Sequence, residues 1–484
     1  MKIAIVAAEL GPYAKAGGLA DVIGALPQAL KRAGAEPCVI VPGYQALLRK
    51  LKIEPFAENQ AIMLDKVQER FRILRAEGSG GVPLYLVDHP GFFDREGIYG
   101  DRHGDYSDNI RRFVFFGRAA AATAAMAHPD VLHAHDWHTA AASIAIRANA
   151  SLRSQFEATS SFFTFHNLAF QGIFERDQFP LLGIDESWFS MDYLEFYGRV
   201  NLMKGALVLA DAASTVSPSY AFEVSHDPDL GFGLDGVLRA KAGRFIGILN
   251  GADYDEWNPA TDQLIGTRYS PERRNGKKAC LYDLREETGL PHRRETPIIA
   301  MVTRMTAQKG VDLLAEALKS IIQHNVQIVM LASGDPGLEE FFKQAERRYP
   351  ENLRVKLGFD NALAHRMQAG SDLFLMPSRF EPCGLTQMYA LKYGVAPIVR
   401  ATGGLRDTVV EFDPRSLKGN GFVFEEADPT ALANAVERAA RTFRNPRLWQ
   451  RLMDNCFRAD FSWARAAGEY LDWFKRVRSE RVAA

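Results

Sequence analysis

The sequence predicts an α/β protein built from two doubly wound domains that face a cleft. The chain has 484 residues, more than a single hydrophobic core usually serves. Short apolar runs alternate with helical patterns in two consecutive series along the chain. Polar and charged residues directly follow several of these runs, and doubly wound sheets bind their ligands at that end of the strands.

Five apolar runs in the first half predict strands of a parallel sheet. Each run is almost continuously apolar, as is typical of strands buried on both faces. Helical patterns separate them, for example residues 21–34, where Leu26 and Leu30 are four apart. The five runs cover residues 2–9, 36–43, 82–89, 130–136 and 160–167.

A second series of the same kind begins near residue 296. The segment "NGADYDEWNPATD", residues 250–262, is rich in Asn, Asp, Gly and Pro and predicts the boundary between the two series. We therefore expect one domain over residues 1–255 and another over residues 256–460. The apolar runs of the second series cover residues 296–303, 326–333, 353–359, 371–378 and 396–402.

Composition indicates a soluble globular protein, with 47% hydrophobic and 24% charged residues. The net charge of −1 gives no electrostatic basis for binding nucleic acid or an anionic membrane. The first apolar run is short and broken by Glu9, which favours a strand over a signal peptide. The four cysteines form no C-x-x-C pair, which favours a reducing compartment. We expect a cytoplasmic protein without nucleic-acid or membrane partners.

The segment "AELGPYAKAGGLADVIG" follows the first predicted strand and resembles a ligand loop. Gly17 and Gly18 permit a tight strand-to-helix turn, and the N-terminus of the following helix favours an anion such as phosphate. Lys15 adds a mobile positive charge. The segment matches neither G-x-G-x-x-G nor a Walker A loop. A plain glycine turn with a solvated lysine is the alternative.

Two further loops repeat this arrangement in the second series. Arg304 and Lys309 lie between an apolar run and a helical pattern, and two such cations suit a diphosphate. Gly403 and Gly404 precede a short helical pattern, where backbone amides can hold an anion or a sugar hydroxyl.

Histidines follow two runs of the first series. "VLHAHDWHTA" contains His133, His135, Asp136 and His138, and clustered His and Asp can bind zinc. The order H-x-H-D-x-H differs from that of the metallo-β-lactamases, which favours a sugar-facing or structural strand end. His166 begins a similar polar segment, "HNLAFQG", where a hydrogen-bonded core histidine is the alternative.

Glu381 follows the run at residues 371–378 and precedes a helical pattern opened by Gly384. An acid at such a position contacts a ligand or caps the helix. Both possibilities stay open at this level.

Nine motifs in family order resemble those of bacterial glycogen synthases and, through them, plant starch synthases. The resemblance covers residues 1 to about 475. One departure stands out, because Ala16 occupies the position where the family usually has threonine. The motifs are "KAGGLADV", "HAHDWHTA", "TFHN", "NLMKGAL", "VSPSYA", "ILNGAD", "RMTAQKG", "EPCGLTQ" and "ATGGLRDTV".

This resemblance implies a retaining glycosyltransferase with two Rossmann-like domains of the GT-B type. Glucose would pass from ADP-glucose to the non-reducing 4-hydroxyl of an α-1,4-glucan such as glycogen, without cofactor or metal. The N-terminal domain would bind the acceptor and the C-terminal domain the nucleotide sugar. Residues 461–484 would form a helix that crosses back to the N-terminal domain. The alternatives are a UDP-glucose-dependent enzyme of the same fold and a zinc hydrolase built on the His133 cluster.

The resemblance also assigns roles to individual residues. Glu381 would lie beside the donor glucose, either as a nucleophile or as an anchor for sugar hydroxyls, and His166 near the anomeric carbon. Oligomeric state and product chain length are not predicted. The expected catalytic residues are Lys15, His166, Arg304, Lys309 and Glu381. The expected substrate-binding residues are Gly17, Gly18, Asp21, Tyr99, Asp136, Asn167, Asn250, Cys383, Gly384, Leu385, Thr386, Gly403 and Gly404.

Overall fold

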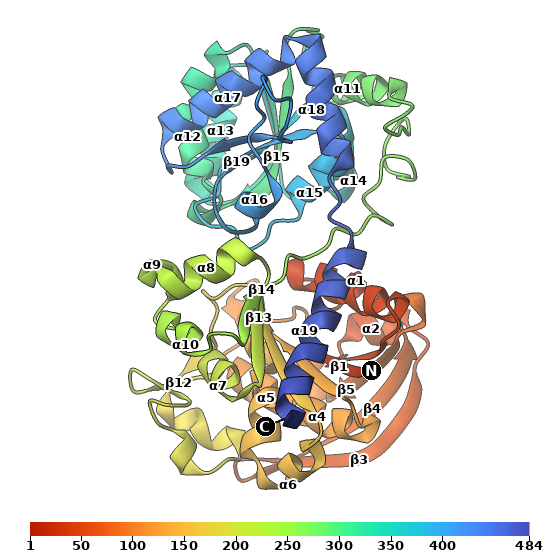
Figure 1. Cartoon of the computed structure of the whole chain (residues 1–484), viewed down its shortest axis with the longest axis vertical. Helices are drawn as coiled ribbons and strands as arrows, with labels where there is room; N and C mark the ends of the chain where they lie inside the picture. Colours follow the sequence, from red (N-terminus) through yellow and green to blue (C-terminus); the bar gives the residue numbers. More distant parts are fainter. Residues whose placement is uncertain (484) are drawn as a thin grey trace. The chain divides into compact units, whose positions relative to one another are not determined.

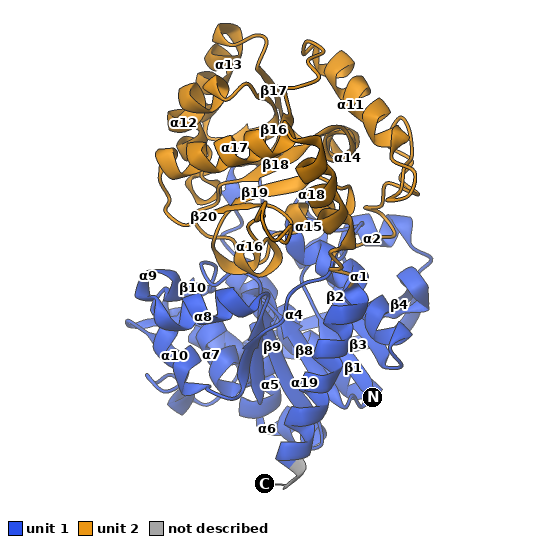
Figure 2. Cartoon of the chain, turned by 45° about the horizontal axis from the view of Figure 1, so that its top comes forward, with its two compact units in different colours: residues 1–251, 463–484 blue, residues 252–462 orange. Residues whose placement is uncertain are grey.

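The computed structural model describes residues 1–483, and the chain divides into two compact units. Unit 1 comprises Met1–Gly251 and Trp463–Ala484, and unit 2 comprises Ala252–Ser462 (Figure 2). No helix among residues 1–483 is both long and apolar enough to cross a membrane.

Unit 1 is built on a mostly parallel sheet, whose described strands follow the order β14-β13-β9-β8-β1-β2-β5-β4-β3. The strands near the middle are the buried apolar runs, whereas β3 and β4 form an antiparallel hairpin at one edge. The strands are β1 (Lys2–Val6), β2 (Glu36–Pro42), β3 (Glu54–Leu64), β4 (Val67–Glu77), β5 (Pro83–Asp88), β8 (Val131–His135), β9 (Ser160–Phe165), β13 (Ala212–Thr215) and β14 (Phe245–Gly247).

Helices pack on this sheet and lie between its strands in the chain (Figure 1). The larger ones are α1 (Gly18–Arg32), α4 (Asn109–Ala127), α5 (Ala140–Ala148), α7 (Leu202–Leu209), α8 (Pro218–His226) and α19 (Trp463–Ala483). Shorter ones are α2 (Gln45–Lys50), α3 (Pro90–Phe93), α6 (Ala150–Arg153), α9 (Pro228–Gly231) and α10 (Asp235–Ala240). Small sheets join β10 (Ile173–Phe174), β11 (Glu195–Phe196) and β12 (Arg199–Asn201), and separately β6 (Gly100–Asp101) and β7 (Gly104–Asp105).

Helix α19 belongs to unit 1 although it ends the chain. Phe474 packs on Phe162 of β9, with ring centroids 4.5 Å apart. Arg478 forms an ion pair of 2.9 Å with Asp130. Burial of an aromatic side chain supplies most of the stabilisation here, because a half-exposed ion pair adds little.

Unit 2 contains a parallel sheet whose described strands follow the order β17-β16-β15-β18-β19-β20. Its strands are β15 (Ile298–Met305), β16 (Gln327–Gly334), β17 (Leu353–Leu357), β18 (Leu373–Met376), β19 (Ala396–Arg400) and β20 (Phe422–Phe424). Its helices are α11 (Asn275–Thr288), α12 (Val311–Gln323), α13 (Pro336–Arg348), α14 (Asn361–Gly370), α15 (Thr386–Lys392), α16 (Gly403–Thr408), α17 (Pro429–Phe443) and α18 (Pro446–Arg458).

The sheet of unit 2 separates two hydrophobic clusters. Ile299 and Met301 of β15 join the cluster that includes α12 and α17, whereas Ile298 and Ala300 join the one that includes α11 and α14. Successive side chains of a strand point to opposite faces, so a run of consecutive apolar residues fills both clusters. This double burial explains why the strands are nearly continuously apolar.

Candidate active site

The loop between β1 and α1 is organised by Glu9, whose side chain is only 4% exposed. Its Oε2 accepts hydrogen bonds from the amides of Ala16 (2.8 Å) and Gly17 (2.9 Å), and its Oε1 accepts one from the Tyr99 hydroxyl (2.7 Å). Two amides just before α1 are therefore already paired with the protein, at the helix N-terminus where the sequence had suggested an anion. Glu9 was not predicted for the site from the sequence. Its signal was a carboxylate placed just after an apolar strand.

Lys15 and Asp21 lie on the open side of this loop. Lys15 Nζ is 2.6 Å from Oδ1 of Asp21, and the two side chains are 51% and 31% exposed. Gly17 is the N-cap of α1, with extended backbone angles, and Gly18 is its first residue. Both charged side chains can exchange their partner for a ligand, because an exposed ion pair holds them only weakly.

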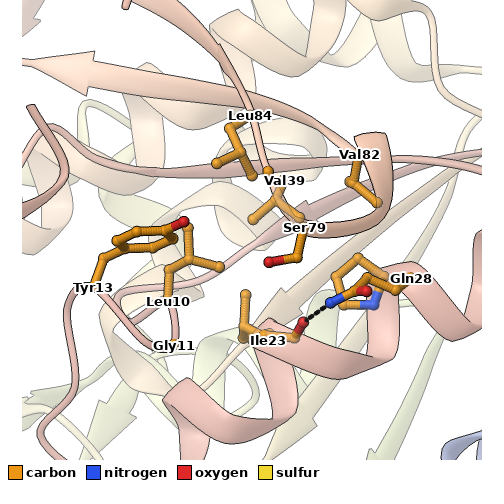
Figure 3. Close-up of a pocket in the computed structure, with 12 residues that line it drawn as sticks. Leu10, Gly11, Tyr13, Ile23, Gln28, Val39, Ser79, Val82 and Leu84 are labelled. Carbon is orange, nitrogen blue, oxygen red and sulfur yellow. Dashed lines mark hydrogen bonds between the residues drawn. The ribbon is translucent and has the colours of Figure 1, made fainter. Parts of the chain in front are cut away.

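A small cavity lies against the same loop (Figure 3). Its lining is mostly apolar and includes Leu10, Tyr13 and Val39, with the amide of Gln28 bonded to the Gly24 carbonyl. None of the predicted site residues lines it. We assign this cavity to loop packing and not to substrate binding.

Three histidines lie on or just after β8 and β9: His133 and His135 of β8 are buried, and His166, directly after β9, is partly buried. His133 Nε2 is 2.7 Å from the Thr164 hydroxyl, and His135 Nδ1 is 3.0 Å from His166 Nε2. Burial lowers the pKa of His133 and of His166 to about 3, and that of His135 well below its usual value. All three rings are therefore neutral at neutral pH.

Asp136 follows β8 with a positive φ of 57°, a conformation that non-glycine residues adopt rarely. Its Oδ1 accepts a hydrogen bond of 2.7 Å from the His166 amide. Burial raises its pKa to about 7, against the opposing effect of this bond, and the nearby Glu9 carboxylate raises it further. Asp136 and His166 are thus fixed to each other at the carboxyl ends of β8 and β9.

The other predicted residues of unit 1 have the following contacts. The ring of Tyr99 stacks on that of His138, with centroids 4.3 Å apart. Asn167 turns its side chain back to accept from the amide of Ala169 (3.0 Å). Asn250 is buried, and its Oδ1 has no partner among the described residues. Among the described residues, no group of three or more His, Cys, Asp or Glu side chains is arranged to hold a metal ion.

In unit 2 the predicted residues follow β15 and β18, which are neighbours in the sheet. Arg304 is exposed near the end of β15. Lys309 Nζ lies 2.6 Å from Glu381 Oε2, and the two side chains are 19% and 8% exposed. The Ser378 hydroxyl also donates to Glu381 Oε2, at 3.1 Å. Sequence analysis did not single out Ser378.

Glycines allow the loops of unit 2 to approach one another closely. A Cβ on Gly310 would lie 2.0 Å from the Pro377 carbonyl oxygen, and one on Gly403 would lie 2.0 Å from that of Glu381. The amide of Gly404 donates to the Glu381 carbonyl at 3.1 Å. These glycines fix the backbone around Glu381, so the Gly404 amide is occupied by protein and not open to an anion.

Glu381 does not cap the helix that follows it. The N-cap of α15 is Leu385, directly after Gly384, and Gly384 has a φ of 71°. Cys383 is buried, and its carbonyl accepts from the Gln387 side chain. The hydroxyl of Thr386 donates to the sulfur of Met376. The carboxylate of Glu381 thus points to Lys309 and Ser378 and not to the helix.

Comparisons with known proteins agree along the whole chain. The family model described as the starch synthase catalytic domain matches residues 2–240, and that of glycosyl transferases group 1 matches residues 285–444. A glycogen synthase of Koribacter versatilis is 41% identical over 487 residues, which cover 100% of this chain and 99% of that protein. A glycogen synthase of Anaeromyxobacter sp. is 43% identical, over 97% of this chain and 98% of its own.

Solved structures give the same result. The catalytic domain of starch synthase IV from Arabidopsis thaliana, bound to ADP and acarbose, superposes with a TM-score of 0.89 at 34% identity. The match covers 99% of both chains. A sucrose-phosphate synthase from Thermosynechococcus elongatus shares only the fold, with a TM-score of 0.59 and 18% identity over 99% of both chains.

Proposed function

Because this chain belongs to the family of glycogen and starch synthases, we propose that it transfers glucose from ADP-glucose to the non-reducing 4-hydroxyl of an α-1,4-glucan. The comparisons confirm the glycosyltransferase class and the α/β domains of the GT-B type that the sequence predicted. The donor, the acceptor and the individual site residues are our proposal.

The structural observation that supports this reaction is the ion pair of Lys309 and Glu381 in unit 2, with Arg304 exposed near the end of β15, the strand that precedes Lys309. Arg304 lies near the end of β15 and Lys309 follows that strand, whereas Glu381 follows the parallel neighbour β18. Such sheets bind ligands at this end of their strands. Arg304 can bridge two phosphate oxygens, and Lys309 supplies a compact charge. A nucleoside diphosphate linked to a sugar matches this set, with the sugar nearest Glu381.

In the proposed reaction the bond between the anomeric carbon and the diphosphate oxygen breaks. A bond to the acceptor 4-oxygen forms on the same face, so the α configuration is retained. The hydroxyl proton leaves with ADP, which balances atoms and charge. Negative charge grows on the departing diphosphate, and fixed cations stabilise that charge more in the transition state than in the ground state.

The ion pair between Lys309 and Glu381 has a consequence for donor binding. A phosphate oxygen that takes Lys309 as its partner weakens the pair and releases the Glu381 carboxylate. The released carboxylate can then accept hydrogen bonds from sugar hydroxyls. We therefore assign Glu381 the role of an anchor for the donor glucose.

In unit 1 we assign the binding of sugar and nucleotide groups to Lys15, Asp21, Tyr99, Asp136 and Asn250. Lys15 and Asp21 are accessible, and Asn250 Oδ1, which has no partner among the described residues, can accept a hydrogen bond from a ligand. His166, held by Asp136, is placed beside the reacting sugar in this proposal. Unit 1 is taken as the acceptor side and unit 2 as the nucleotide side.

The test is release of nucleoside diphosphate from ADP-glucose and from UDP-glucose, with and without glycogen. We expect glycogen-dependent release of ADP, and little release of UDP. An ADP-bound starch synthase among the similar structures supports the adenine nucleotide. Faster release of UDP would replace the donor in this proposal, and release that does not depend on glycogen would replace the acceptor.

We also propose that the protein works in the cytoplasm. Cys38, Cys280, Cys383 and Cys456 form no disulfide bond within residues 1–483, which suits a reducing compartment. Fractionation of the native host, with the protein followed by antibody, checks this location.

A further inference from the structure

The rings of His135 and His166 are hydrogen-bonded to each other at the end of the sheet of unit 1. His135 is the last residue of β8, and His166 directly follows β9, its parallel neighbour (Figure 2). His135 Nδ1 lies 3.0 Å from His166 Nε2. In such a bond one nitrogen carries the proton and the other accepts it, so the bond couples the tautomers of the two rings.

Both rings carry a single N–H. Burial lowers the pKa of His166 to about 3 and that of His135 well below its usual value, with further lowering by His133. A neutral imidazole has one donor and one acceptor nitrogen. Two arrangements of the pair are therefore possible, one with the proton on His135 Nδ1 and one with it on His166 Nε2.

The surroundings of His135 select between these arrangements. Its second nitrogen, Nε2, is buried and has no partner among the described residues. If His166 donated, His135 would carry its own proton on Nε2, as a buried N–H without an acceptor. In the backbone, buried N–H groups without a partner are rarer than carbonyl oxygens without one, and we apply the same preference to the imidazole nitrogens. The proton of the bond therefore belongs to Nδ1 of His135, which donates to His166 Nε2.

We propose that His135 is a positioning residue that sets the tautomer of His166, so that His166 offers Nδ1–H as a donor to a hydroxyl of the bound sugar. The sugar contact rests on the proposed function, whereas the tautomer itself does not. His166 is only partly buried, and its Nε2 is occupied by His135, so Nδ1 is the ring nitrogen left for a ligand. Its amide is held by Asp136 at 2.7 Å, which fixes the backbone from which the ring projects.

This assignment separates two roles of His166. A ring that presents N–H cannot donate a lone pair to positive charge at the anomeric carbon. The ring instead orients a sugar hydroxyl, and any stabilisation of that positive charge falls to backbone oxygen. His135 touches neither substrate nor reacting atoms and acts through His166 alone.

The test is long-range ¹H–¹⁵N correlation NMR of the full chain labelled in its 11 histidines, with the His166 ring assigned by its loss in His166→Gln. We expect a protonated-type shift at His166 Nδ1 and an unprotonated-type shift at Nε2. The reverse pattern in the wild-type protein would overturn the proposal. The spectrum is recorded without substrate, so it tests the tautomer of His166 independently of the glucosyltransferase activity.

Three variants complete the test. His135→Leu removes the donor and should convert His166 partly or wholly to the other tautomer, with turnover lower by about tenfold to a hundredfold. His135→Asn places an amide N–H near the former Nδ1 and should restore part of both readouts. His133→Gln is the matched control, because His133 is buried on the same strand but bonds Thr164 and not His166. An unchanged His166 spectrum in His135→Leu would reject the role of His135.

Discussion

Lys309 and Glu381 form an ion pair in unit 2, with Lys309 Nζ 2.6 Å from Glu381 Oε2. The two residues are 72 positions apart in the chain and meet because β15 and β18 are neighbours in the sheet. Both side chains are mostly buried, so each stabilises the charge of the other in a place that water reaches poorly. In the proposed reaction, a bound diphosphate competes with Glu381 for Lys309.

The first prediction concerns the cations. Arg304→Ala and Lys309→Ala should each lower turnover by about 10²–10³, or about 2.7–4 kcal/mol, since each removes a fixed charge aimed at a developing anion. Initial rates at saturating ADP-glucose measure the effect. Lys319→Ala, which removes an exposed cation of α12, is the control and should leave turnover unchanged. Near-normal turnover in both site variants would place the diphosphate elsewhere.

The second prediction concerns Glu9. Glu9→Gln replaces an oxygen that accepts from the loop amides or from Tyr99 by an NH₂ group, which cannot accept. A hydrogen bond to a charged group contributes about 1.5–3 kcal/mol, so we expect turnover to fall roughly tenfold or more. Glu36→Gln, at an exposed position of β2, serves as control. Equal activity of the two variants, with equal melting temperatures, would show that the loop does not depend on Glu9.

Sequence patterns predicted most of the buried strands, because strands covered on both faces are largely apolar. Strand β13 was missed although it is buried, since its sequence AAST is short and half polar. The hairpin of β3 and β4 was missed, since its residues are largely exposed and form no such run. The edge strands β14 and β20 were also not predicted, because each has only three residues. Glycines gave a mixed result. Gly404 was expected to bind a ligand, whereas its amide is bonded to the Glu381 carbonyl.

Contacts between side chains that are far apart in the chain could not be predicted from the sequence. Lys309 and Glu381 were both predicted for the site, but their pairing depends on strand order, which no local pattern encodes. Glu9 was noticed only as an interruption of an apolar run, because its amide partners become visible once the loop folds back. The His135–His166 bond likewise follows from the neighbouring positions of β8 and β9.

The third prediction is a pH dependence of stability in unit 2. His365 Nδ1 lies 2.8 Å from Asp262 Oδ2, and Trp257 stacks on the His365 ring. Burial alone lowers the pKa of His365, but hydrogen bonds to Asp262 and Glu256 outweigh it and raise the pKa to about 9. The folded protein therefore holds this proton more tightly than the unfolded chain does.

The sign of the effect follows from linkage. The stabilisation by protonated His365 is complete below its ordinary pKa of about 6.5 and is lost as pH rises through about 9, by up to about 3 kcal/mol. Urea unfolding followed by tryptophan fluorescence at about pH 6 and about pH 10 measures the loss. His365→Gln, which cannot titrate, should lose less stability over this range. An equal loss in wild type and variant would assign the pH dependence to other groups.

The fourth prediction concerns metal removal. EDTA should leave the rate of glucose transfer unchanged, because Arg304 and Lys309 supply the positive charge that stabilises the leaving diphosphate. The rate is compared before and after exhaustive dialysis against chelator. Loss of activity in EDTA, with recovery on addition of magnesium or zinc, would reject this mechanism.

The last prediction distinguishes the possible roles of Glu381. A nucleophile must attack with a carboxylate, so Glu381→Gln should be almost as inactive as Glu381→Ala. An anchor needs only acceptors for sugar hydroxyls, and the amide keeps one carbonyl oxygen, so Gln should exceed Ala. Because a hydrogen bond to a charged group is worth about 1.5–3 kcal/mol, the Gln variant should still be slowed substantially.

The ion pair with Lys309 adds a second readout. Either substitution frees Lys309 from Glu381, so diphosphate no longer competes with the carboxylate and ADP should bind at least as tightly as in the wild type. Turnover at saturating ADP-glucose, corrected for folded protein, and the dissociation constant of ADP are measured on both variants. We expect impaired turnover, with Gln above Ala, and ADP binding that is retained.

Equal collapse of turnover in the two variants would favour the nucleophile. Full activity in either variant would remove Glu381 from the site, and lost ADP binding would show that the carboxylate is needed to position Lys309 for the diphosphate.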